Sequence, residues 1–260
     1  MNFSKYYYET SALSQRILTE LIKRKRSLIF WSIFPLSILF INGYILSERA
    51  NLELSEAFKL SAPTSLTGAA LFFSCLGGSV STVVSEREQK TLKRLFISPL
   101  SGVSYFLGIF LAHFSMGMGQ TILVYFTLFL LGETIEGSVF LGLIILFLSI
   151  ASYVGVGLIL GTNLAKRTED VNAIVATFGV PLLIIGGTFL PTSLFPDGLL
   201  KIAQFNPIFH MNEAMIQLWA NGDSFNDIKN HFWFLLVFSI MMMISGWFSY
   251  YRMIQTEKTL

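Results

Sequence analysis

Charged side chains are scarce in this sequence. Only 13% of its 260 residues are Asp, Glu, Lys or Arg, whereas 53% are hydrophobic. A soluble domain carries about 25% charged residues, so this composition argues against an ordinary water-soluble fold. The mean hydropathy of +0.63 and the long stretches without any charge predict that lipid is the main solvent of the chain.

Cysteine occurs once, at Cys75, inside an apolar stretch. A single cysteine excludes an intrachain disulfide and argues against a cysteine-based metal site. A cleavable signal peptide is not expected either, because the first apolar stretch begins near Ser27, after a polar and basic lead.

The sequence also lacks the short motifs of common catalytic and nucleotide-binding sites. No glycine is followed by lysine, so a P-loop for ATP is excluded, and neither H-E-x-x-H nor G-x-S-x-G occurs. His113 is the only histidine within a long apolar stretch, near Ser115 and Gln120. Such a group is either functional or a satisfied interhelical hydrogen bond, and we favour the second. The chain is therefore not expected to be an enzyme on its own.

Six apolar stretches are long enough to cross a bilayer core of about 30 Å, which takes about 20 helical residues. They predict an all-α integral membrane protein with one transmembrane domain over residues 1–260. Pro181 lies in the fifth stretch and is expected to kink or locally open that helix. The predicted spans are residues 27–47, 65–84, 103–131, 138–164, 171–190 and 232–251.

The distribution of Lys and Arg predicts the orientation. With both termini in the cytoplasm, 14 of these residues face the cytoplasm and four face outwards, and the inverted arrangement exchanges the two numbers. The positive-inside rule selects the first arrangement. We expect a multi-pass protein of the cell (inner or plasma) membrane with cytoplasmic termini.

The first 26 residues are polar but contain apolar positions at helical spacing, followed by the basic cluster 23–26. This pattern predicts an amphipathic helix lying in the membrane interface, with its basic side against lipid phosphates. The alternative is that these residues form the first turns of a longer first span. The apolar positions are Leu13, Ile17, Leu18, Leu21 and Ile22.

Residues 85–102 form a charged segment between the second and third spans. Ser85 and Glu88 match an S-x-x-E capping box, so a helix is expected to begin at Ser85. Pro99 and Gly102 are expected to end it. The segment would then be a short cytoplasmic helix with an apolar face, tied to the bilayer at both ends, on which another protein can press.

The stretch 191–231, predicted to lie outside, contains two short amphipathic segments, 196–205 and 211–221, separated by Asn206 and Pro207. Both are too short to span the membrane and too apolar to lie in water. We expect a re-entrant helical hairpin that dips into the outer leaflet or packs over the bundle. The alternative is a small outer cap without function.

Glycines mark the second and fourth spans. Gly155 and Gly157 could suggest a nucleotide-binding turn, but no strand precedes them and the segment is apolar. Gly157 and Gly161 instead have the spacing of close helix packing in lipid.

Three segments carry a resemblance to a known family. Residues 86–101 read EREQKTLKRLFISPLS, residues 179–196 read GVPLLIIGGTFLPTSLFP, and residues 205–215 read FNPIFHMNEAM. In this order and topology they resemble the transmembrane permeases of type-2 ABC exporters, which include drug-resistance and polysaccharide exporters. The match covers nearly the whole chain, although Lys90 stands where the family commonly has Gly and Lys93 where it commonly has an acidic residue.

The resemblance implies that segment 85–102 is a coupling helix seated in a groove of a separate ATP-binding subunit, and that the outer hairpin lines or gates the exit. It implies that ATP and Mg²⁺ bind to that subunit, that this chain holds no cofactor or metal, and that two permease chains, identical or related, work with two ATPases. The implied ATPase-coupling residues are Glu86, Arg87, Glu88, Thr91, Leu92 and Leu95. The implied hairpin and gate residues are Pro191, Pro196, Asn206, Pro207 and Glu213.

A transport path is expected between the two permease copies, near the second and fifth spans, where Gly78, Ser79 and Pro181 would let helices shift. Its cargo would be amphipathic, drug-like or lipid-like, with a polysaccharide or lipid-linked glycan as the alternative. Membrane lipids are the other expected partner, and nucleic acid is not expected. A secondary transporter or channel would need intramembrane charge or an inverted repeat, and a membrane-embedded enzyme would need a nucleophile with its base.

Overall fold

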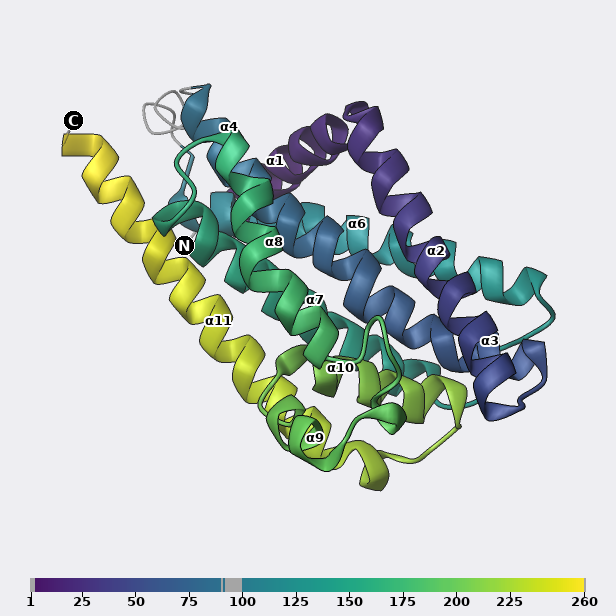
Figure 1. Cartoon of the computed structure of the whole chain (residues 1–260). Coiled ribbons are helices and arrows are strands. Elements are labelled where there is room, and N and C mark those ends of the chain that lie inside the picture. Colours follow the sequence, from purple (N-terminus) through teal and green to yellow (C-terminus); the bar gives the residue numbers. More distant parts are fainter. Residues whose placement is uncertain (1–2, 90, 92–99, 260) are drawn as a thin grey trace.

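The computed structural model of the chain describes residues 3–89, 91 and 100–259 (Figure 1). All elements within these residues are helices, and six helices are long and apolar enough to cross a bilayer. The prediction of an all-α protein with six spans is therefore confirmed.

Each of the six spanning helices overlaps one predicted span; the first, second and sixth extend beyond it at both ends, whereas the fifth ends earlier than predicted. The second is a continuous unit, Leu54–Glu88, made of four successive elements. Its elements are α3 (Leu54–Thr64), η1 (Ser65–Ala70), η2 (Phe72–Gly77) and α4 (Gly78–Glu88). The other spans are α2 (Lys25–Ala50), α6 (Gly102–Leu130), α7 (Val139–Asn163), α8 (Thr168–Ile185) and α11 (Phe225–Thr259). The shorter elements are α1 (Phe3–Lys23), η3 (Thr192–Leu194), α9 (Asp197–Ala203), α10 (Pro207–Met215) and η4 (Ile216–Ala220).

The helical unit Leu54–Glu88 forms the centre of the bundle. In its most apolar stretch 83% of the residues are buried, against 33% for α2 and 17% for α11. Small side chains explain this position, because they let neighbouring helices approach closely. Its elements contact α2, α6, α7, α8 and α10.

The glycines of α7 serve close packing, as their spacing predicted. A Cβ atom at Gly157 would collide with the Ser79 hydroxyl of α4, and one at Gly161 would press on Val80 and Val83. Gly155, on another side of α7, faces the backbone of α11 in the same way. The glycines of α7 therefore let two neighbouring helices, α4 and α11, pack closely against it.

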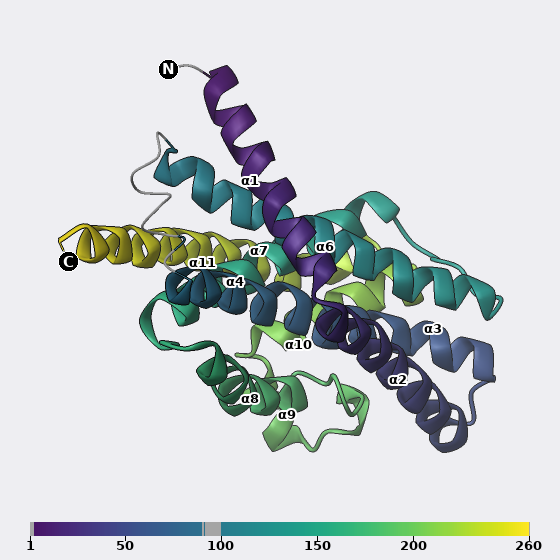
Figure 2. The same ribbon diagram turned by 90° about the horizontal axis from the view of Figure 1, so that it is seen from above.

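The two ends of the bundle are built from different elements (Figure 1). We call the end that holds the C-termini of α4 and α7 and the N-termini of α2, α6 and α8 the base, and the opposite end, which holds α9 and α10, the hairpin end. The helix α1 crosses the bundle at the base and packs mainly against α6 (Figure 2). It buries Leu13, Ile17 and Leu21 and is separated from α2 by Arg24 alone.

One prediction about the charged segment is wrong. Ser85 does not begin a helix: it lies inside α4, and its hydroxyl donates to the carbonyl of Thr82 at 3.2 Å. No helix-breaking residue separates Val84 from Glu88, so the helix of the second span simply continues. Residues 90 and 92–99 lie outside the described residues, and the coupling helix that was expected over 85–102 stays a prediction there.

The segment predicted to form a re-entrant hairpin contains short helices, and its re-entry into the membrane stays a prediction. Two short helices, α9 and α10, are separated at Asn206, and α10 continues through η4. The helix α8 runs without a break through Pro181 and ends at Ile185, before a turn in which Gly187 has a φ of +82°. A side chain at that φ would be strained, which explains why the helix stops short of the predicted Leu190.

Candidate functional site

Three consecutive charged residues at the C-terminal end of α4 bond to several different elements of the base. A helix turns by about 100° per residue, so neighbouring side chains must diverge. Glu86 reaches α1 and α6, Arg87 reaches the end of α7, and Glu88 reaches the start of α8.

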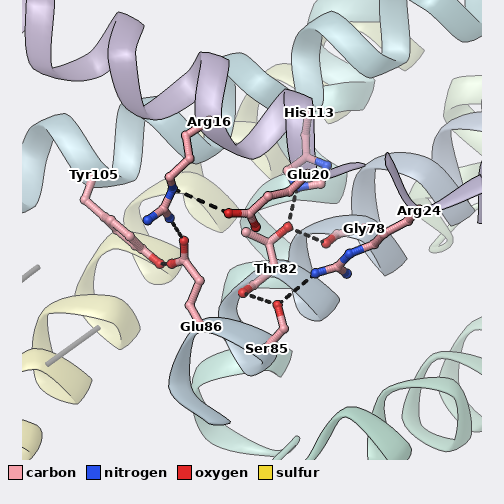
Figure 3. A network of polar contacts seen from close by, with 9 residues as sticks. All are labelled: Arg16, Glu20, Arg24, Gly78, Thr82, Ser85, Glu86, Tyr105 and His113. Carbon is pink, nitrogen blue, oxygen red and sulfur yellow. Dashed lines mark hydrogen bonds and ion pairs between the residues drawn. The ribbon is translucent and has the colours of Figure 1, made fainter. Parts of the chain in front are cut away.

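Glu86 lies at the centre of a buried polar cluster (Figure 3). Its carboxylate accepts hydrogen bonds from the guanidinium of Arg16 in α1 and the hydroxyl of Tyr105 in α6. Arg16 also approaches Glu20, with 3.8 Å between Nε and Oε1. The ring of Tyr105 stacks on Tyr250 of α11, with 4.9 Å between ring centroids. This single carboxylate therefore joins α4 to α1 and α6 and, through Tyr105, to α11.

Arg87 closes the C-terminal end of α7. Its guanidinium donates to the carbonyl oxygens of Gly161, Thr162 and Ala165 at 3.1–3.2 Å. The last carbonyls of a helix have no partner within the helix and carry its negative dipole end, so a guanidinium is well matched to them.

Glu88 binds the N-terminal end of α8. Its carboxylate accepts hydrogen bonds from the Thr168 backbone N–H at 3.1 Å and from the Thr168 hydroxyl. An acidic group is favourable at a helix N-terminus, where N–H groups are free and the dipole is positive. The predicted capping partner of Ser85 therefore caps a different helix.

The helix α1 and Arg24, the residue that follows it, are attached to the base at two more points. Arg24 donates to the hydroxyls of Ser81 at 2.9 Å and Ser85 at 3.1 Å, both in α4. Glu9 accepts from the hydroxyl of Ser104 at 2.7 Å and the backbone N–H of Ser101 at 3.2 Å, at the start of α6. The Ser104 hydroxyl bond is the main reason why the pKa of the Glu9 carboxyl lies below its usual range.

The structure describes four of the six implied coupling residues. Glu86, Arg87 and Glu88 lie together at the base. Thr91, three positions further along the chain, is half-buried. Leu92 and Leu95 lie outside the described residues. The direct role of these residues in binding an ATPase stays a prediction. Glu86 is buried, so its side chain faces the bundle.

Sequence reasoning missed the partners of these residues. Arg16, Tyr105 and Thr168 complete the base, yet none belongs to a motif. The only signal was the hydrophilic character of the chain around Arg16, in an otherwise apolar protein.

His113 makes an interhelical hydrogen-bond pair, the interpretation that we favoured. Its Nε2 atom lies 3.2 Å from the Thr82 hydroxyl and its Nδ1 atom 3.1 Å from the Ser74 carbonyl oxygen, so it links α6 to η2 and α4 (Figure 3). Gly78 lies beneath the ring, and a Cβ atom there would collide with it.

At the hairpin end, Asn206 and Pro207 start α10. The Asn206 side chain accepts from the Ile208 backbone N–H at 3.0 Å and donates to the Leu182 carbonyl of α8 at 2.6 Å. Pro207 follows in the first turn, where its missing N–H costs nothing. Pro191 and Pro196 precede η3 and α9.

Glu213 faces the segment that leads into the hairpin. Its carboxyl accepts from the Thr192 hydroxyl at 2.5 Å. Burial raises the pKa of this carboxyl above its ordinary value, and the Thr192 hydrogen bond opposes that rise.

A second buried polar cluster, which sequence reasoning missed, holds the hairpin to the spans. The Asn212 side chain accepts from the Thr67 hydroxyl of η1 and donates to the Gly186 carbonyl at 2.8 Å. Asn42 of α2 donates to the Thr188 carbonyl at 2.8 Å. Polar residues inside apolar stretches were the available signal, because they must find partners at that depth.

A cleft of about 620 Å³ opens between α2, the η2–α4 segment and α8 near the base. Gly77 and Ser81 line it, whereas the predicted path residues Gly78 and Ser79 face α6 and α7. Pro181 is exposed on α8, so the structure does not bring the three predicted path residues together. Within the part of the chain that the structure describes, no cluster of three His, Cys, Asp or Glu residues could hold a metal ion.

Comparison with known proteins gives concordant results. A family model described as ABC-2 type transporter matches residues 8–219. The chain is 27% identical over 157 residues to the probable multidrug ABC transporter permease YbhR of Escherichia coli strain K12, and to the protein of the same name in Escherichia coli O157:H7. The match covers 60% of this chain and 42% of each relative, so the chain spans less than half the length of the curated relatives that it matches.

Proposed function

The chain belongs to the ABC-2 type transporter family, and on this premise we propose that it is the permease subunit of an ATP-driven exporter. In this proposal separate subunits bind Mg²⁺-ATP and hydrolyse it, and two permease chains work with two such ATPases. The observation that carries the proposal is the junction at the end of α4, where Glu86, Arg87 and Glu88 bond to α1, α6, α7 and α8.

The junction provides a route for mechanical coupling. The charge count favours a cytoplasmic base, where an ATPase would press on segment 85–102. A displaced α4 would carry the start of α8 with it through Glu88 and Thr168. The other end of α8 is bonded to Asn206, so the same displacement would reach the hairpin. The start of α8 is held by the charge-assisted bond from Glu88, and its other end by the hydrogen bond from Asn206. These two attachments suit α8 to pass motion across the membrane.

The cleft at the base is the proposed entry for cargo from the cytoplasm or the inner leaflet. Its volume of about 620 Å³ falls within the range of about 300–1,000 Å³ that is typical of sites for drug-sized ligands. Phe30 and Phe73 contribute aromatic surface. These features favour a small amphipathic or lipid-like cargo over a polysaccharide.

Copurification with the candidate ATPase tests the proposed function. The tagged chain, its Glu88→Arg variant and a Thr168→Val variant would each be purified in detergent, and complex recovery and ATPase activity compared. Glu88→Arg reverses the charge at the base, whereas Thr168→Val removes only the hydroxyl that Glu88 binds within the chain. We expect the wild-type chain to recruit the ATPase, Glu88→Arg to lose it and Thr168→Val to keep it.

A folded permease that recruits no ATPase would overturn the exporter proposal and bring a secondary carrier or channel to the front. Equal complex recovery for the wild type and Glu88→Arg would overturn the role of Glu88 in the ATPase contact. Folding of each variant is checked by the single thiol of Cys75, which is buried in the intact protein and unreactive until it unfolds.

A further inference from the structure

We propose that the cleft near the base binds the headgroup of an anionic, phosphate-bearing lipid between Arg24 and Arg26, with an acyl chain along the aromatic wall beneath. The inference rests on the proposed function, because it names the class of cargo that the cleft would admit. Two independent features carry it: uncompensated positive charge at one end of the cleft and apolar surface along the rest.

Arg24 and Arg26 both line the cleft. Neither lies within ion-pair distance of a carboxylate of the residues that the structure describes, in contrast to Arg16, which pairs with Glu86. Arg24 is half-buried, and its guanidinium is bonded to two serine hydroxyls, which are neutral. A partly desolvated charge without a counter-charge is unfavourable, and an anion in the cleft would relieve it.

Two acidic groups near the cleft mouth, Glu88 and Asp170, are already engaged. Glu88 accepts from the backbone and hydroxyl of Thr168, which itself lines the cleft. Asp170 accepts from the backbone N–H groups of Lys166 and Arg167 at 2.9–3.1 Å. Among the residues that line the cleft, the charged ones are Arg24 and Arg26. A guanidinium group binds phosphate through paired hydrogen bonds.

The remaining wall of the cleft suits a hydrocarbon chain. Phe30 of α2 and Phe73 of η2 meet edge to face, with 5.2 Å between ring centroids, and Val175 and Ala176 of α8 line the same cleft. A ligand that satisfies both parts has its charge at the base and its apolar body towards the middle of the bundle. A phospholipid of the adjoining leaflet has this polarity, whereas a free phosphate would leave the apolar wall unused.

Binding of short-chain lipids to the full chain in detergent, without ATP or ATPase, tests the inference. The probes are dioctanoyl phosphatidylglycerol, dioctanoyl phosphatidylcholine and inorganic phosphate, titrated while tryptophan fluorescence is recorded, since Trp31 lines the cleft. We expect phosphatidylglycerol to bind about tenfold more tightly than either of the other probes, because only it offers both a net negative headgroup and a chain.

Three variants locate the site. Arg26→Gln should weaken phosphatidylglycerol binding by about tenfold, because it removes a charge-assisted contact. Lys25→Gln is the matched control: it removes the same charge from the adjacent, exposed residue, which does not line the cleft, and should leave the affinity unchanged. Ala176→Trp fills the cleft with both arginines intact and should abolish binding. Equal affinities for the two lipids, or equal losses in Arg26→Gln and Lys25→Gln, would overturn the inference.

This outcome is separable from the test of the proposed function. A chain that recruits its ATPase but binds the two lipids equally overturns the lipid site alone. A chain that binds phosphatidylglycerol selectively but recruits no ATPase supports the lipid site and overturns the exporter proposal.

Discussion

At the scale of residues, adjacency in sequence and adjacency in space differ most at the end of α4. Glu86, Arg87 and Glu88 resemble one docking motif, yet their side chains leave the helix in three directions. The sequence shows that three charged residues follow one another here. It does not show their partners, because Arg16 lies 70 positions from Glu86 and Thr168 lies 80 positions from Glu88, and no spacing rule relates such residues.

The Arg16–Glu86 pair predicts an uneven response to mutation. Arg16→Met leaves the buried Glu86 carboxylate without its counter-charge, and we expect a loss of about 2 kcal/mol in the free energy of unfolding, a value reduced because Arg16 is partly exposed. The loss of stability is followed by the rate at which a maleimide dye reacts with Cys75 on heating, because this buried thiol becomes accessible when the protein unfolds.

Lys5→Met is the control for this prediction. It breaks the pair between Lys5 and Glu9, in which the Lys5 side chain is 53% exposed, and should cost less than about 0.5 kcal/mol. The double variant Arg16→Met/Glu86→Gln should recover part of the loss. Equal effects of Arg16→Met and Lys5→Met would contradict the central place of Glu86 in the base.

Glu213 predicts a pH dependence of the hairpin end. A carboxyl whose pKa is raised in the folded state favours its protonated form, so its burial costs nothing below the ordinary value of 4.5 and progressively more as the pH rises through the folded pKa. Glu213→Gln keeps an acceptor for Thr192 without the charge. We expect the variant and the wild type to have equal Tm values near about pH 4 and the variant to have the higher Tm at about pH 8.

The comparison of the two Tm curves isolates Glu213, because His210, whose pKa is lowered by burial, is present in both proteins. A Tm difference that does not change with pH would contradict the assignment.

At the scale of elements, the absence of charge predicted where the spans lie, and the structure explains why the second continues past its predicted C-terminal end. The apolar stretch of this span ends before Glu86, but the helix continues to Glu88 because Glu86 and Arg87 find partners within the bundle. The wide turns of η1 and η2 had no sequence signal, since their small residues are equally compatible with an ordinary helix.

The contact between α7 and α4 predicts different fates for two glycines. Gly157→Ala places a methyl group against the Ser79 hydroxyl and the Leu76 carbonyl, and we expect it to lower the free energy of unfolding by about 1–3 kcal/mol through overpacking. Gly119→Ala in α6 meets nothing within 4 Å and should cause no loss. The thiol-reactivity measurement at Cys75 compares the two, and a loss in Gly119→Ala equal to that in Gly157→Ala would contradict close packing as the reason for Gly157.

At the scale of the whole molecule, α8 is held at its ends more than along its length. Glu88 caps its first turn, and Asn206 and Asn212 bind the carbonyls of Leu182 and Gly186 at its other end. Only 22% of its most apolar stretch is buried within the chain, whereas the corresponding value for α7 is 67%. A helix with strong ends and weakly packed sides can move as a rigid rod between two arrangements.

This asymmetry predicts which distance changes during an ATP cycle. Spin labels at Ser27→Cys in α2 and Asn172→Cys in α8 stand on opposite walls of the cleft. In the complex with the ATPase, we expect the interlabel distance measured by double electron–electron resonance to shift between the nucleotide-free and the vanadate-trapped states. A pair at Leu143→Cys in α7 and Val237→Cys in α11 should not shift, because these two helices pack extensively on each other. Cys75 is buried and would stay unlabelled, so the signal comes from the introduced cysteines. If both pairs shifted equally, α8 would not be the moving element, and the route from base to hairpin would have to pass through the whole bundle.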